Sequence, residues 1–114
     1  MKSKDVVRSL AALAQESRLA VFRLLVEKGP AGMNAGAIAA KLEVVPATLS
    51  FHLKELSNAG LVQSQQDGRF VIYSANFDAM NELLGFLSSN CCGGNPCTPV
   101  TVCKPARVAV RSRS

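Results

Sequence analysis

The stretch that decides the fold is NAGAIAAKLEVVPATLSFHLKEL, residues 34–56. Asn34 is a good N-cap, which predicts that a short helix begins just after it. Apolar residues then recur at helical spacing at Ile38, Ala39 and Leu42. Residues 43–45 leave only a tight connection before Pro46, which can begin a helix because its missing N–H costs nothing there. The stretch therefore predicts two helices joined by a short turn.

The second of these helices has two different sides. Its buried side is marked by leucines at helical spacing, namely Leu49, Leu53 and Leu56. The other side presents small, polar and aromatic residues, which are Pro46, Ala47, Thr48, Ser50, Phe51 and Lys54. Two helices joined by three or four residues, the second exposing polar groups, form a helix-turn-helix. In this motif the second helix enters the major groove of DNA.

Two further helices are predicted before this stretch. Residues 4–14 carry apolar side chains at helical spacing, at Val6, Val7, Leu10 and Leu13. Ser17 is predicted to cap the following helix, and Gly29-Pro30 stops it. The apolar side of that helix is formed by Leu19, Phe22, Leu25 and Val26.

The hydrophobic period changes at Leu61. Residues 61–66 and 69–74 have the pattern of two strands, and Asp67-Gly68 between them is a strong hairpin signal. Asn76 can cap a last helix, whose apolar side is formed by Phe77, Met80, Leu83, Leu84 and Leu87. From residue 90 the chain becomes rich in Gly, Pro, Cys, Ser and Arg and shows no helical stripe.

This order of elements predicts a mainly α fold of the winged helix-turn-helix type, with five helices and a two-stranded wing. We expect residues 1–89 to form one domain that binds DNA and dimerises, since small helical domains often bury more surface by pairing. Residues 90–114 are expected to be a flexible tail that carries cysteines and basic residues.

Six residues are candidates for DNA contact, namely Thr48, Ser50, Phe51, His52, Lys54 and Arg69. The hydroxyls of Thr48 and Ser50 can reach a base edge or a phosphate. Lys54 is placed for a phosphate, which positions a protein without reading sequence. Arg69, beside the hairpin turn, can reach the adjacent minor groove, whose negative potential favours cations.

Three of these candidates have a structural alternative. Phe51 can contact a thymine methyl group or pack onto a neighbouring helix. His52 lies beside the leucine side of its helix, which favours a packing or backbone hydrogen-bonding role over direct DNA contact. Arg69 near a turn is often only a solubilising charge. The interpretation therefore depends on the whole order of elements rather than on one residue.

The net charge of +5 is a weak argument for DNA binding. Four of the positive charges follow residue 103, at Lys104, Arg107, Arg111 and Arg113, and no acid follows Glu82. Residues 1–103 therefore hold nine Lys and Arg against eight acids, a net charge of +1. The positions of the charges, and not their sum, must support nucleic-acid binding. The basic residues after Cys103 either add non-specific DNA affinity or form a solubilising end.

Three of the chain's four cysteines are clustered after the last predicted helix. Cys91 and Cys92 are adjacent, and Cys97 follows across four residues. No His, Asp or Glu occurs from residue 83 onward, so the cluster offers only sulfur, which suits soft, thiophilic ions. Cys103 is either a fourth ligand of an all-thiolate zinc or cadmium site or an idle thiol. Disulfide formation by Cys97 under oxidants is a further alternative, as is an incidental role.

Other functional classes fit the chain less well. The polar N-terminal residues do not resemble a signal peptide, and no apolar run is long enough to span a membrane. We therefore expect the reducing cytoplasm, where clustered cysteines more often bind metal or sense redox state than form disulfides. No Cys-x-x-Cys opens a helix and no pair of nucleophile and base is visible, so an enzyme is not expected.

Several separated motifs resemble the ArsR/SmtB family of metal- or metalloid-responsive repressors. They are AALAQESRL at 11–19, PATLSFHLKEL at 46–56, AGLV at 59–62 and GRFVIY at 68–73, and the resemblance covers roughly residues 6–88. It implies a homodimer built from the first and last helices. It also implies that the fourth helix binds a palindromic operator that matches the two-fold axis of the dimer.

Departures from the family pattern narrow the kind of metal site. Many members carry Cys-x-Cys on the third helix, where residues 34–38 have no sulfur, and others bind zinc through His on the last helix, which has no His here. The remaining cluster, Cys91, Cys92 and Cys97, resembles the C-terminal arsenite site of some arsenic-sensing members. The resemblance implies a repressor that arsenite or antimonite releases from DNA. A thiol redox sensor or a zinc- or cadmium-responsive repressor is the alternative.

Overall fold

The computed structural model describes residues 1–90 and Gly93. Its helices are α1 (Ser3–Leu13), α2 (Glu16–Lys28), α3 (Ala35–Leu42), α4 (Pro46–Asn58) and α5 (Phe77–Ser88), and its strands are β1 (Met33–Asn34), β2 (Val62–Asp67) and β3 (Phe70–Ala75). The five expected helices are thus present. Most of the predicted tail, including Cys91, Cys92, Cys97 and Cys103, lies outside the described residues. The domain boundary at residue 89 stays a prediction.

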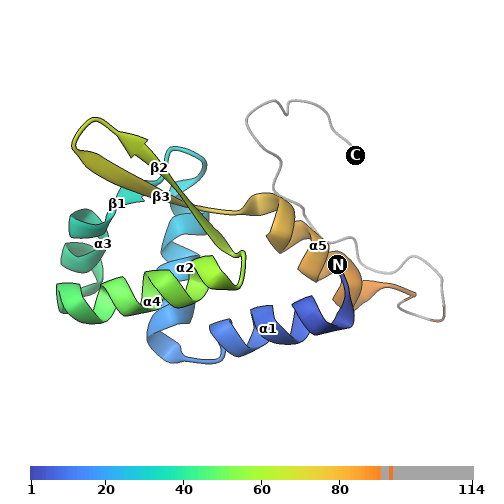
Figure 1. Ribbon diagram of the computed structural model, residues 1–114. Coiled ribbons are helices and arrows are strands. Elements are labelled where there is room, and N and C mark those ends of the chain that lie inside the picture. Colours follow the sequence, from blue (N-terminus) through green and yellow to red (C-terminus); the bar gives the residue numbers. More distant parts are fainter. Residues whose placement is uncertain (91–92, 94–114) are drawn as a thin grey trace.

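The elements are arranged in two groups (Figure 1). Helices α2, α3 and α4 pack on one another and on the sheet, which forms the upper part of the view. Helices α1 and α5 lie side by side at the opposite end from α3 and the wing, the hairpin formed by β2 and β3. The predicted order of helix, short helix, turn, helix and hairpin is therefore the arrangement that the structure shows.

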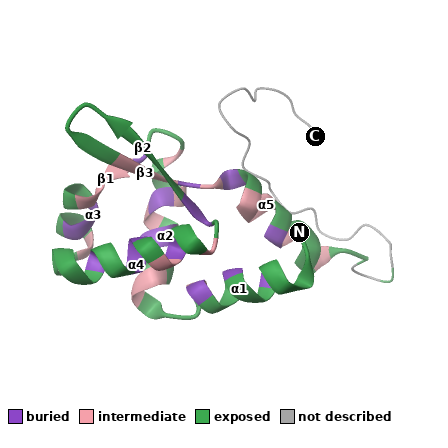
Figure 2. Cartoon of the chain, in the orientation of Figure 1, coloured by how far each residue is buried: buried purple, intermediate pink, exposed green. Residues whose placement is uncertain are grey.

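The core lies between α2, α3, α4 and the base of the wing. Its largest fully buried side chains include Leu25, Ile38, Leu49, Leu53, Leu56 and Leu61. The predicted leucine side of α4 is confirmed, because its three leucines are each 2 % exposed or less. Figure 2 shows this burial as bands along α2 and α4, with exposed residues on the outer side of α4.

The sheet differs from the predicted two-stranded wing. It has three antiparallel strands in the order β1-β3-β2, because Met33 pairs with Tyr73 and Asn34 with Ile72. Gly32 allows this approach, since its φ is +71° and a Cβ there would collide with the carbonyl oxygen of Tyr73. A strand of two residues is too short to show a period of its own, so the sequence pattern missed it.

The hairpin turn lies one residue later than predicted. Asp67 pairs with Phe70, so the two loop residues are Gly68 and Arg69, and not Asp67 and Gly68. Gly68 has a φ of +62°, whereas Arg69 is not among the residues with positive φ. This is the pattern of a turn that requires glycine only at its first central position. Arg69 is therefore at the very tip of the wing.

Most of the predicted helix caps are confirmed and one is wrong. Asn34 accepts a hydrogen bond from the backbone N–H of Ala37 at 2.8 Å, and Asn76 accepts one from Ala79 at 3.2 Å. The helix α2, however, is capped by Gln15, whose side chain accepts from the N–H of Arg18 at 2.8 Å, and not by Ser17. The cap of α2 lies two residues earlier than predicted because the longer side chain of Gln15 reaches the N–H of Arg18.

Helices α1 and α5 leave much of their apolar surface uncovered. Val7 is 64 % exposed and Leu87 is 56 % exposed, and Leu10 and Phe86 are also exposed. Most of the expected apolar stripe of the first helix is therefore not covered by the rest of the chain. In α1 the buried residues are Val6 and the small residues Ser9 and Ala12. Among residues 1–90 and Gly93, no helix is both long and apolar enough to cross a lipid bilayer.

Candidate nucleic-acid interface

The exposed side of α4 carries four of the six predicted DNA-contact residues. Thr48, Ser50, Phe51 and Lys54 are all exposed, whereas Leu49 and Leu53 between them are buried. The two sets alternate as a helix of 3.6 residues per turn requires. Phe51 is 55 % exposed, so its ring is not covered by a neighbouring helix. The helix is thus anchored by its leucines and leaves its polar groups and one aromatic ring open to a partner.

The connection between α3 and α4 fixes how α4 is presented. Glu43 has φ 56° and ψ 48°, a left-handed conformation that ends α3. The backbone N–H of Val44 then donates to the carbonyl of Ala39 at 3.0 Å. Val45 has no side chain that can cap, but its carbonyl accepts the first helical bond of α4 from Leu49 at 2.9 Å. Each of the three residues between α3 and α4 is thus fixed by its backbone conformation or by a backbone hydrogen bond.

His52 lies apart from the exposed candidates. It is only 6 % exposed, and its Nδ1 has no hydrogen-bond partner. Burial lowers the pKa of the imidazole, and the nearby Arg18 guanidinium lowers that pKa further. Its ring centroid is 5.8 Å from that of Phe51, with the planes at 57°. This buried position agrees with the packing alternative for His52 rather than with direct DNA contact.

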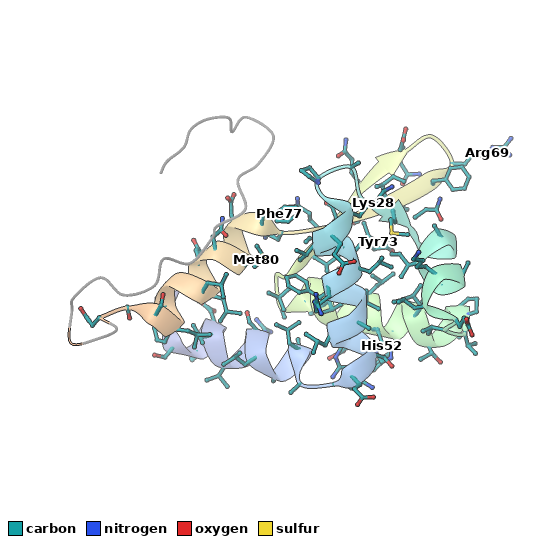
Figure 3. All side chains as sticks on the ribbon, turned by 180° about the vertical axis from the view of Figure 1, so that it is seen from behind. Lys28, His52, Arg69, Tyr73, Phe77 and Met80 are labelled. Carbon is teal, nitrogen blue, oxygen red and sulfur yellow. The ribbon has the colours of Figure 1, made fainter. Side chains whose placement is uncertain are left out.

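The wing supplies the remaining candidate and one residue that the sequence interpretation missed. Arg69 extends from the tip of the hairpin (Figure 3), where the side chain of Gln66 donates to the carbonyl of Gly68 at 3.0 Å and braces the turn. Phe70 beside it is 58 % exposed. Phe70 is at the exposed end of β3, whose other end at Ala75 is buried, and the sequence pattern alone does not show which end leaves the core.

The wing tip and the start of α4 lie at the same end of the molecule. Both face away from α1 and α5, as the two opposite views show (Figures 1 and 3). One partner that contacts this end can therefore touch α4 and Arg69 together. A groove-binding helix with a flanking wing is the geometry by which helix-turn-helix proteins contact the major groove and the adjacent backbone or minor groove.

A concave region lies where α1, the start of α2 and the end of α4 meet. It is an open cleft of about 370 Å³ lined by Arg8, Ala11, Ala12, Arg18, Glu55, Asn58 and Ala59. The Nε of Arg18 donates to the carbonyl of Ala12 at 2.8 Å, which ties the end of α1 to α2. In the part of the chain that the structure describes, no three His, Cys, Asp or Glu side chains are grouped to hold a metal ion.

Comparison with known proteins identifies the family. A family model described as a helix-turn-helix domain matches residues 13–65. The chain is 35 % identical over 91 residues to YceK, an uncharacterized HTH-type transcriptional regulator of Bacillus subtilis strain 168, and the match covers 77 % of this chain and 90 % of that protein.

Solved structures agree with this relationship. An ArsR-like transcriptional regulator from Rhodococcus sp. RHA1 superposes with a TM-score of 0.67 at 29 % identity, covering 75 % of this chain and 77 % of that one. The homodimeric winged helix-turn-helix domain of Mb0332 from Mycobacterium bovis, described as a possible ArsR-family regulator, gives 0.63 at 26 % identity, covering 75 % and 76 %. The chain belongs to the HTH-type transcriptional regulators, and its fold is that of the ArsR-like winged-helix structures it resembles.

Proposed function

We propose that this regulator is a homodimeric repressor that arsenite releases from a palindromic operator. In this proposal α4 and the wing bind the DNA, and Cys91, Cys92 and Cys97 bind the metalloid. The observation that carries the metalloid part is the placement of three thiols within seven residues, starting three residues after α5 ends at Ser88. Antimonite, which also prefers sulfur ligands, is expected to act in the same way.

The exposed chemistry of α4 and the wing supports DNA binding. Thr48 and Ser50 offer hydroxyl groups, and Lys54 and Arg69 offer cations, and all four are exposed. Hydrogen bonds and charges of this kind contact phosphates and base edges. Lys54 and Arg69 are the two cations among these proposed contacts, so we expect a modest salt dependence from this surface.

The uncovered apolar residues of α1 and α5 support the dimer. Val7 and Leu10 on one helix and Phe86 and Leu87 on the other are exposed within a single protomer. Contiguous apolar surface of this kind usually marks an interface. The related Mb0332 domain is described as homodimeric. Pairing through these helices would leave α4 and the wing of each protomer free at the far ends.

The chemistry of the thiols suggests how binding would be coupled to release. Trivalent arsenic bonds to three thiolates in a pyramidal arrangement, and binding displaces the thiol protons. Closing this site would draw together the segment that follows α5, one of the two proposed dimer helices. A switch from mostly bound to mostly free DNA needs a differential binding energy on the order of 5 kcal/mol. The coupling is reciprocal, so operator DNA must weaken arsenite binding by the same factor.

The test is a titration of arsenite into a complex of the reduced protein with its operator. Release of the DNA by the wild type, with no release of the Cys97→Ser variant, is expected. The matched control is Cys103→Ser, which should respond like the wild type. An operator affinity that does not change at saturating arsenite would reject the metalloid role.

Other inducers are separated in the same assay. Release by zinc or cadmium that requires Cys103 would favour a four-thiolate metal site, and release by an oxidant alone would favour a redox sensor. If DNA binding responds to none of the metal ions, arsenite or the oxidant, the protein is a DNA-binding regulator whose signal does not depend on its thiols.

A further inference from the structure

The first two turns of α4 expose apolar side chains where a DNA reader usually exposes hydrogen-bonding ones. Val45, just before the helix, is 65 % exposed, and Phe51 is 55 % exposed. Ala47 is exposed between them. From residue 45 to residue 54 the chain has no Arg, Asn or Gln, side chains that pair with guanine or adenine through two hydrogen bonds. The side chains that can donate hydrogen bonds on this exposed side are Thr48, Ser50 and Lys54.

We define the α4 apolar patch as the exposed residues Val45, Ala47 and Phe51. Ala47 and Phe51 are four residues apart and so lie one above the other on the same face of the helix. Val45 is the residue just before the helix begins at Pro46. The ring of Phe51 lies 5.8 Å from that of the buried His52, measured between centroids, with a tilt of 57°. Phe51 itself stays 55 % exposed, so its ring is available to a partner.

The surroundings of the patch indicate its occupant. Hydroxyl groups of Thr48 and Ser50 and the ammonium group of Lys54 are exposed on the same helix, within two turns of it. A protein partner with an apolar surface would leave these groups unpaired, whereas the major groove offers acceptors and phosphates beside one apolar group, the C5 methyl of thymine. N-terminal residues of the second helix are the ones that contact base edges in helix-turn-helix proteins.

We propose that the α4 apolar patch reads thymine methyl groups in the major groove. The inference rests on the proposed binding of an operator by α4 and names the chemical feature that this helix selects. Phe51 and Val45 cover the methyl groups, Ala47 leaves room for them, and Lys54 fixes the register on a phosphate. Specificity then comes mainly from the positions of thymines in each half-site, and less from paired hydrogen bonds.

The test removes only the methyl groups. An operator is selected from a pool of random duplexes, and each thymine of a half-site and its symmetry mate are replaced in turn by deoxyuridine, which keeps the hydrogen-bonding pattern. Each contacted methyl is expected to cost about fourfold in affinity, the value for burying one such group. Thymines that α4 does not reach should show no change.

Variants assign the effect to the patch. Phe51→Ala and Val45→Ala should each lose the discrimination at the thymines that the truncated side chain covers, and the double variant should bind the thymine and deoxyuridine operators with nearly equal affinity. The matched control, Lys54→Ala, should weaken both operators and keep the discrimination between them, because a phosphate contact carries no sequence information. Both apolar residues are more than half exposed, so truncation should leave the fold intact, which thermal unfolding can verify.

Three outcomes would overturn the inference. Equal binding of thymine and deoxyuridine operators by the wild type would show that methyl groups are not read. Discrimination that survives in the variant that carries both Phe51→Ala and Val45→Ala would place the reading elsewhere. A change in the solution mass of the free protein on Phe51→Ala would make the patch a protein interface. A chain that selects no duplex at all would instead contradict the proposed function.

Discussion

Gly32 shows at the scale of one residue how a strand pairing can depend on a missing side chain. Its backbone passes so close to β3 that a Cβ would collide with the Tyr73 carbonyl and lie 2.8 Å from Cγ2 of Ile72. Its φ of +71° adds a conformational cost for any other residue. The steric clash and the positive φ are thus two separate reasons for glycine at this position, and their contributions to stability can be measured separately.

We expect Gly32→Ala to lower the free energy of unfolding by more than about 2 kcal/mol, because the strain of positive φ is joined by a clash with backbone. Gly60→Ala is the control, since Gly60 has a φ of +79° but a Cβ added there would meet nothing within 4 Å. It should cost about 1 kcal/mol. Urea denaturation of both variants measures the difference. Equal losses would mean that β1 does not need the close approach.

His52 makes stability depend on pH in a predictable direction. Burial and Arg18 lower the pKa of its imidazole from the ordinary value of 6.5, so the unfolded chain takes up the proton first as the pH falls. The free energy of unfolding should hence be highest above 6.5, decline as the pH falls through 6.5 toward the lowered pKa, and then level off.

The chain has one histidine, so a variant can test this assignment directly. In His52→Gln the free energy of unfolding should change much less over the same pH interval. Denaturant titrations at a series of pH values would measure both profiles. A wild type and a variant with parallel profiles would assign the pH dependence to other groups.

Asn76 has two roles at the scale of secondary-structure elements. Its side-chain oxygen caps α5, and its Nδ2 donates to the carbonyl of Gly60 at 3.0 Å, which joins the start of α5 to the end of α4. Gln15 caps α2 by accepting one hydrogen bond from the backbone N–H of Arg18. Asn76 therefore links two elements in addition to capping a helix, whereas Gln15 acts as a cap.

Asn76→Ala is expected to lower the free energy of unfolding by about 2 kcal/mol, since it removes a cap and a link between helices. Gln15→Ala should cost about 1 kcal/mol, the usual value for one exposed cap. Thermal or urea unfolding measures both. If Gln15→Ala proves the more costly of the two, the link between α4 and α5 contributes little to stability.

The sequence predicted those elements whose patterns are long enough to repeat. Leucines at 49, 53 and 56 fixed the buried side of α4, and Asn34 and Asn76 marked two helix starts. The strand β1 has two residues and forms only because Gly32 approaches β3, a contact between distant segments. The register of the turn also shifted by one residue, because Asp67-Gly68 and Gly68-Arg69 are both compatible with a hairpin.

The candidate site was predicted in part. A helix pattern can say which side of α4 faces away from the leucines, and Thr48, Ser50 and Lys54 are indeed exposed. It could not decide whether Phe51 would be covered, since that depends on how close a neighbouring helix comes. Phe70 was missed because its exposure depends on where the wing leaves the core. The cysteine site stays a prediction, as all four cysteines lie outside the described residues.

At the scale of the whole molecule, substitutions of the exposed apolar residues of α1 and α5 are expected to dissociate the proposed dimer. Leu10→Glu or Leu87→Glu would place a charge in the proposed interface and should yield a folded monomer. Operator affinity should fall about a hundredfold or more, because two linked half-site contacts become independent. Leu19→Glu is the matched control, an exposed leucine on α2, and should stay dimeric. Sedimentation and operator binding test both, and a control that also dissociates would place the interface elsewhere.

The placement of α4 and the wing at one end, and of α1 and α5 at the other, sets a rule for promoter architecture. Two protomers joined at one end hold their reading helices on the same side of the duplex, so the half-sites must share a helical phase of about 10 base pairs. Lengthening the spacer by about five base pairs, half of that helical repeat, would turn one half-site to the far side of the duplex. Each dimer would then bind DNA through the α4 helix of one protomer only.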